Sequence, residues 1–144
     1  MKENVIYWSR WFLVLPGTIV AGIMATFPLH WLLYFAYASG QEVELGSVRF
    51  FIELFFRNAS AESIEYTLTP FVIAAAFVFA GYKLAPKYKF KTAIALFVVY
   101  VIVWTVIHIY AFSHGQDFSI RILLALLGAV LGLGIAKTES TNKD

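Results

Sequence analysis

The residues of this chain that could bind a ligand or a metal inside an apolar setting are its histidines and one arginine. His30 and His108 each stand within a long apolar run, and His114 follows soon after the second. Imidazole nitrogens bind divalent metals and haem iron, so two histidines from different helices form a candidate site. Arg121, near the start of the last apolar run, is a candidate contact for an anionic substrate or lipid. Alternatively, it reaches the headgroups by snorkelling, or it pairs with Asp117, Glu62 or Glu65.

Both intramembrane histidines lie in series of residues spaced four apart, which is the spacing of one helix face. If the two faces meet, they form an outward-facing pocket near His30 and His108. Its candidate residues are His30, Tyr34, Tyr100, Trp104, His108 and Arg121. A metal would use His30, His108 and His114 with a carboxylate such as Glu65 or Asp117, and a b-type haem would use the first two. In the alternative, the histidines only form hydrogen bonds across helices.

The elements that must position these residues are apolar helices. Apolar residues make up 60% of the chain and charged residues 14%, and the mean hydropathy is +0.75. Segments of about 20 apolar residues cross a bilayer as helices. The spans are expected at 11–38, 64–84, 92–112 and 118–136. The sequence therefore predicts one domain, an all-α integral membrane bundle of four transmembrane helices. Pro28 should interrupt the first span, because it cannot donate to the carbonyl of Met24.

The stretch from Tyr82 to Lys91 sets the orientation, because it carries four lysines and no acid between two spans. Lysine and arginine near a span stay on the cytoplasmic side. With cytoplasmic termini, eight basic residues lie inside and three outside, out of 11 in the chain. We therefore expect a multi-pass protein of the bacterial inner membrane with both termini in the cytoplasm. The same segregation argues against a nucleic-acid partner.

The first outer loop has a different character, and 47–57 shows helical periodicity. Arg49, Glu53 and Arg57 share one face, with apolar side chains on another. We expect an amphipathic interfacial helix there, on the membrane surface. A lid folded over the bundle and a partner-binding face are the alternatives. The tail, 137–144, is polar and is expected to be disordered.

Gly128 and Gly132 form a GxxxG pair, which permits close helix packing. This pair either packs within the chain or forms a homodimer. No acid or lysine occupies the middle of a span, which argues against a proton-coupled carrier. There is no cysteine, so disulfides and thiol chemistry are excluded. We find no nucleophile–base pair and no phosphate-binding loop, so we expect no enzyme.

Two functions follow from these patterns. In the first, the chain is a non-catalytic membrane component or accessory subunit that binds a protein or lipid partner through the outer amphipathic segment and the glycine face of the fourth span. In the second, the pocket near His30 and His108 binds a small ligand, metal or haem, which would make the chain a carrier, sensor or electron-transfer subunit. Because few polar residues lie within the spans, we favour the non-catalytic membrane component.

Overall fold

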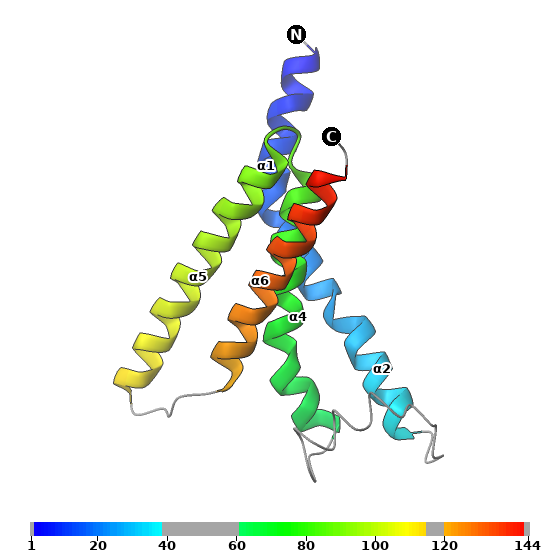
Figure 1. Cartoon of the computed structure of the whole chain (residues 1–144), viewed down its shortest axis with the longest axis vertical. Coiled ribbons are helices and arrows are strands. Elements are labelled where there is room, and N and C mark those ends of the chain that lie inside the picture. The colour runs from blue at the N-terminus through cyan, green and yellow to red at the C-terminus, as the bar shows by residue number, and fades with distance from the viewer. Residues whose placement is uncertain (1, 39–60, 115–119, 143–144) are drawn as a thin grey trace.

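The computed structural model describes residues 2–38, 61–114 and 120–142, which are all helical apart from short turns. The helices are α1 (Lys2–Met24), α2 (Thr26–Ala38), α4 (Ala61–Leu84), α5 (Lys89–Ser113) and α6 (Ile120–Thr141) (Figure 1). Four segments are long and apolar enough to cross a membrane: Trp11–Phe35, Glu62–Leu84, Lys89–Ser113 and Ile120–Thr141. The predicted all-helical class with four candidate spans is confirmed. The interfacial helix expected at 47–57 lies outside the described residues.

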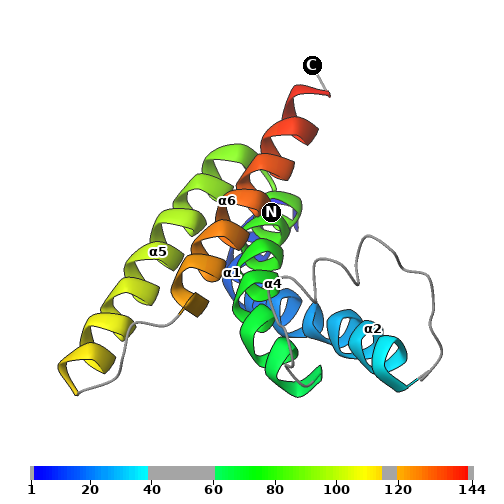
Figure 2. The same cartoon turned by 60° about the horizontal axis from the view of Figure 1, so that its bottom comes forward.

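The first span is interrupted at Ala25, between α1 and α2. Pro28 has no N–H to donate to the carbonyl of Met24, and its ring disturbs the preceding turn. Thr26 Oγ1 donates to the carbonyl of Ile23 at 2.7 Å beside the break. The interruption expected from Pro28 is therefore present, and α2 leans away from the line of α1 (Figures 1 and 2).

The central helix is α4, since it contacts each of the other four described helices. The helices α5 and α6 also contact each other, whereas α2 contacts neither of them within the described residues. The buried core follows α4 through Ala74, Val78 and Tyr82, and Ala93 of α5 and Ala129 of α6 complete it. Most of these side chains are small, so the helix axes approach closely.

The helices α4 and α6 run parallel and touch through their backbones. A methyl group on Gly128 would lie 2.1 Å from the carbonyl oxygen of Phe71, and one on Gly132 would lie 2.5 Å from that of Ala75. Both distances are shorter than any van der Waals contact, so only a hydrogen atom fits at these positions. The GxxxG pair is thus covered by α4, and a homodimer through it would have to displace that helix.

Small residues also bring α1 and α5 onto α4. A methyl group on Gly17 of α1 would lie 2.7 Å from Leu84 Cδ1, and one on Gly81 of α4 would meet Leu96 of α5. Thr18 is fully buried beside Gly81, and its hydroxyl donates to the carbonyl of Leu15 at 2.7 Å. The hydroxyl therefore brings no unsatisfied polar group into this contact.

Both termini and the turn between α4 and α5 lie at one end of the bundle (Figure 1). We call this the lysine end, after Lys83, Lys87, Lys89 and Lys91, and the opposite end the distal end. Pro86 lies just after the end of α4, and a proline disfavours helical geometry at the residue that precedes it. Tyr88 is the only non-glycine residue with positive φ in the described part of the chain, at φ 52°. This left-handed conformation costs about 1–2 kcal/mol.

The last helix extends past the expected end at Ala136 to Thr141. Thr138 Oγ1 donates to the carbonyl of Gly134 at 3.1 Å, which keeps a polar side chain compatible with the helix. Glu139 forms an ion pair with Lys83 of α4. This contact joins the last turns of α6 to α4, and the sequence alone does not indicate it.

We predict that Gly128→Ala destabilises the protein, because its methyl group would have to push α6 away from the carbonyl oxygen of Phe71. Overpacking of this kind costs about 1–3 kcal/mol. Gly134→Ala is the matched control, since a methyl group there meets nothing within 4 Å and alanine favours helix by about 1 kcal/mol. Unfolding in detergent micelles should rank the proteins as Gly134→Ala, wild type, Gly128→Ala. Equal stability of both variants would contradict the backbone contact.

Candidate functional site

The structure divides the predicted pocket into two separate parts. His30 and Tyr34 lie on α2, which leans to one side of α4, while Tyr100, Trp104 and His108 lie on α5, on the other side (Figure 1). The two helices do not contact each other within the described residues. The pocket was conditional on these two faces meeting, and they do not meet. His30 and His108 therefore do not share a ligand in this arrangement.

The first part is a contact between a histidine and a carboxylate at the distal end. His30 Nδ1 lies 2.9 Å from Glu65 Oε2 and 3.1 Å from Oε1, so one ring nitrogen contacts both carboxylate oxygens. The histidine side chain is 56% exposed and the carboxylate 30%. Among the described helices, α2 contacts only α4 and its neighbour α1, so this contact and the buried Leu33 hold α2 on the bundle.

Arg121 belongs to the same end of the bundle, on α6. Its guanidinium carbon lies 3.7 Å from the centroid of the Tyr66 ring, which is a close cation–π contact between α6 and α4. Tyr66 directly follows Glu65, so the first turns of α4 receive side chains from both α2 and α6. We call His30, Glu65, Tyr66 and Arg121 the distal cluster. Asp117, another expected partner of Arg121, lies outside the described residues.

The second part is a ladder of rings along α5. The Tyr100 and Trp104 rings stack at 5.8 Å with an angle of 12°, and Trp104 and His108 lie 4.8 Å apart. His108 Nδ1 lies 2.8 Å from the carbonyl oxygen of Trp104. A carbonyl only accepts, so Nδ1 carries the proton and Nε2 of the neutral ring is an acceptor. We call Tyr100, Trp104 and His108 the α5 stripe.

The α5 stripe carries three polar atoms that form no hydrogen bond within the described chain. The indole nitrogen of Trp104 is shielded and has no acceptor. The Tyr100 hydroxyl and His108 Nε2 also have no hydrogen-bond partner there, although the Tyr100 ring lies 5.8 Å from that of Phe77. Such groups can bind a complementary donor or acceptor from another molecule.

The third histidine, His114, is separate from both parts. Its Nδ1 lies 2.8 Å from the carbonyl oxygen of Tyr110, and the two rings are 4.2 Å apart. The described residues contain no group of three metal-binding side chains close enough to share an ion. The expected set of His30, His108 and His114 is therefore spread over α2, α5 and the end of α5. Each histidine has its own local partner.

Sequence reasoning missed Tyr66, and it considered Glu65 as a metal-binding carboxylate or as a partner of Arg121 but not as the partner of His30. The residues that mattered, Glu65 and Tyr66, open the second span, where a charged residue and an aromatic residue precede an apolar run. That position signals the end of a span, where tyrosine is an ordinary interfacial anchor. Nothing in the sequence identifies the partners on α2 and α6.

We predict a measurable coupling between His30 and Glu65. Because both groups are partly exposed, a double-mutant cycle with His30→Ala and Glu65→Gln should give about 0.2–1 kcal/mol, decreasing with added salt. The quantity to measure is the free energy of unfolding in detergent micelles. Glu62→Gln is the matched control on the same turn of α4, and it should show no coupling to His30→Ala. Coupling of equal size to both acids would contradict a specific pair.

We also predict that the contact of Arg121 depends on the ring of Tyr66 and not on its hydroxyl. Tyr66→Phe should leave stability near that of the wild type, whereas Tyr66→Leu should cost about 0.5–2 kcal/mol. Thermal unfolding with Arg121 and with Arg121→Gln tests this. If both Tyr66 variants behave alike with Arg121 present, the ring contact contributes nothing.

Comparison of the chain with models of protein families, with curated proteins and with solved structures finds no significant match. No relative therefore supplies an activity or a ligand. The function has to be argued from the distal cluster, the α5 stripe and the arrangement of the helices. Arg121 Nε in the distal cluster also forms no hydrogen bond within the described chain, but the α5 stripe presents several such atoms in one row along a single helix.

Proposed function

We propose that this protein is a non-catalytic component of a membrane, an accessory subunit that binds a helix of a protein partner along the α5 stripe. The observation that carries the proposal is the α5 stripe itself, with three polar atoms that form no hydrogen bond within the described chain. The four apolar helices support a multi-pass membrane protein. The segregation of lysines supports cytoplasmic termini in a bacterial inner membrane.

The position of α5 supports a binding surface on its distal half. Its buried residues, Ala93 and Leu96, both lie near the lysine end, and no residue after Leu96 is buried. Tyr100, Trp104 and His108 are partly buried, and other side chains of this half are open, including Ile109 at 64% and Phe112 at 72% exposed. The distal half of α5 diverges from α4 (Figure 1), whereas its axis runs alongside that of α6 in both views (Figures 1 and 2). By contrast, α6 buries residues from Ala125 to Ala136.

Exposed apolar residues alone would be consistent with contact to lipid, because lipid chains are as apolar as leucine. Polar atoms are different, since an unsatisfied hydrogen-bonding group in hydrocarbon costs several kcal/mol. Polar side chains hold helices together in membranes by bonding across the interface. The α5 stripe offers the donors of Trp104 and Tyr100 and the acceptor of His108 in one row. A partner helix with complementary serine, threonine or asparagine side chains fits this row.

The competing ligand, metal or haem function has no comparable support. It required His30 and His108 on facing helices, and α2 and α5 do not contact each other within the described residues. His30 Nδ1 is already bound to Glu65, and His108 Nδ1 to the carbonyl of Trp104. We therefore do not propose a cofactor for this arrangement.

Site-specific photocrosslinking in the native membrane tests the proposal. The photoreactive amino acid p-benzoylphenylalanine should give one defined protein adduct when it replaces Trp104, because that position lies in the α5 stripe. The matched control is the same replacement at Ile102, which is 56% exposed and lies on a different face of α5. We expect no such adduct from position 102. Adducts with the same protein at similar yield from both positions would contradict a binding face.

A second variant separates binding from a general effect on folding. His108→Leu removes the imidazole acceptor but keeps an apolar side chain of similar size. We predict that it lowers recovery of a stoichiometric partner from mild detergent by at least fivefold, with the melting temperature unchanged. Native mass spectrometry of the purified wild type measures the partner directly. A wild-type mass equal to the bare chain, together with no crosslink at position 104, would overturn the proposal.

A further inference from the structure

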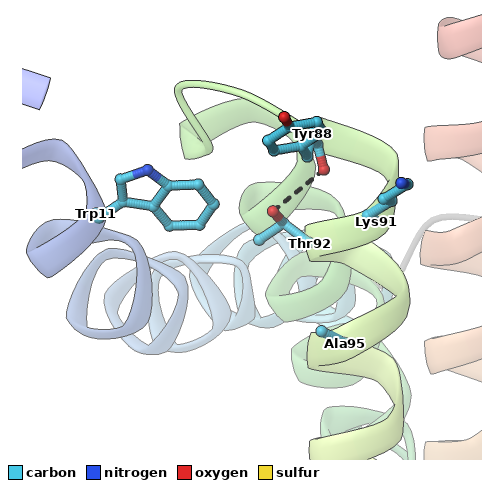
Figure 3. Close-up of a pocket in the computed structure, with 5 residues that line it drawn as sticks. All are labelled: Trp11, Tyr88, Lys91, Thr92 and Ala95. Atoms are coloured by element: carbon cyan, nitrogen blue, oxygen red, sulfur yellow. Dashed lines mark hydrogen bonds between the residues drawn. The ribbon is translucent and has the colours of Figure 1, made fainter.

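We propose that the groove between α1 and α5 at the lysine end binds the headgroup of one anionic phospholipid from the adjoining leaflet. The groove has a volume of about 510 Å³, and its lining residues are Trp11, Tyr88, Lys91, Thr92 and Ala95 (Figure 3). The two helices do not contact each other within the described residues, although both pack on α4. This inference is independent of the proposed function, because it uses the opposite end of α5 and none of the residues of the α5 stripe.

The charge of the groove favours a phosphate group. Lys91 lies at its rim and has no carboxylate partner within the described chain, and its ammonium nitrogen is 5.5 Å from the centroid of the Tyr88 ring. Lys89 is exposed two residues earlier and also has no such partner there. Lys83, in contrast, is neutralised by Glu139. Lys91 therefore places a positive charge at the groove, and Lys89 adds another on the same turn of α5, where anionic headgroups are attracted.

The other walls suit the boundary between headgroup and acyl chain. Trp11 is the first residue of the first candidate span, and its indole projects from α1 toward α5 (Figure 3). Tryptophan prefers the interface because its ring is apolar and its N–H is polar. Thr92 and Ala95 form the opposite wall, and their small side chains leave room for the glycerol and the first methylene groups. Thr92 Oγ1 lies 3.2 Å from the carbonyl oxygen of Tyr88, which fixes its rotamer.

The backbone at the rim is held in a costly conformation. Tyr88 has φ 52° and ψ 38°, and its ring is 68% exposed beside Lys91. Strained residues of this kind gather at ligand sites. Tyr88 also precedes α5 without a side-chain cap, so the positive end of the helix dipole adds to the two lysines. A groove of this size holds a small ligand group and not a helix.

The test uses the full chain, stripped of lipid in detergent and titrated with defined lipids under native mass spectrometry. The probes are phosphatidylglycerol and phosphatidylcholine with identical acyl chains. We expect one phosphatidylglycerol molecule to bind with roughly 20-fold preference, because each lysine near a phosphate contributes about fivefold. Lys89→Gln and Lys91→Gln should each reduce this preference about fivefold. Trp11→Leu should weaken the binding of both lipids.

The matched control is Lys137→Gln, which removes an exposed lysine at the same end of the bundle but on α6, away from the groove. It should leave the preference unchanged. An equal loss in this control would mean diffuse attraction to the basic end, and equal binding of the two lipids would mean no headgroup recognition; either result overturns the proposal. Binding of sn-glycerol 3-phosphate in place of the lipid would also overturn it, in favour of a soluble phosphate. The lysine variants lie on the surface, so they remain informative even if Trp11→Leu misfolds.

Discussion

The close contact between the backbones of α4 and α6 is the constraint on which the rest of the structure depends. Gly128 against Phe71 and Gly132 against Ala75 set the distance between the two parallel helices at its minimum. Polar contacts then fasten the same pair at both ends, with Arg121 on Tyr66 and Lys83 with Glu139. These contacts follow one another in the same order along α4 and along α6, so the two helices stay in register from the distal end to the lysine end. The other helices pack on this pair.

The packing of α5 follows from the sizes of its side chains. Near the lysine end, Ala93 and Leu96 pack against α4 where Gly81 leaves space. Farther along, the Tyr100 ring meets Phe77, and large rings separate helix axes more than alanine does. We infer that this change from small to large residues makes α5 diverge. On the other side, the loss of the hydrogen bond at Pro28 makes α2 diverge for a different reason. As a result, α2 and α5 lie apart in the distal half of the molecule, whereas the helices pack closely on α4 in the lysine half.

Much of this fold could be predicted from the sequence, because long apolar runs, Pro28 and the lysine turn act locally. The periodicity of Tyr100, Trp104 and His108 correctly placed them on one face of one helix. Periodicity does not say which neighbour that face meets, so the pocket joining His108 to His30 could not be tested by the pattern alone. The partners Glu65 and Tyr66 depend on which helices touch α4, and that is a property of packing. Glu139 likewise lies in a polar tail by sequence, and its contact with Lys83 depends on the packing of α6 against α4.

The central claim is that the distal halves of α2 and α5 lie apart, so that the α5 stripe is not satisfied by α2. The chain contains no cysteine, so single cysteines at Phe35 and Ile109 can be spin-labelled without other changes. Both side chains are more than 60% exposed. Pulsed electron paramagnetic resonance in lipid nanodiscs should give a long distance for this pair, and a short one for a reference pair between α4 and α6. A short distance between positions 35 and 109 would bring the faces of His30 and His108 together and would contradict the account.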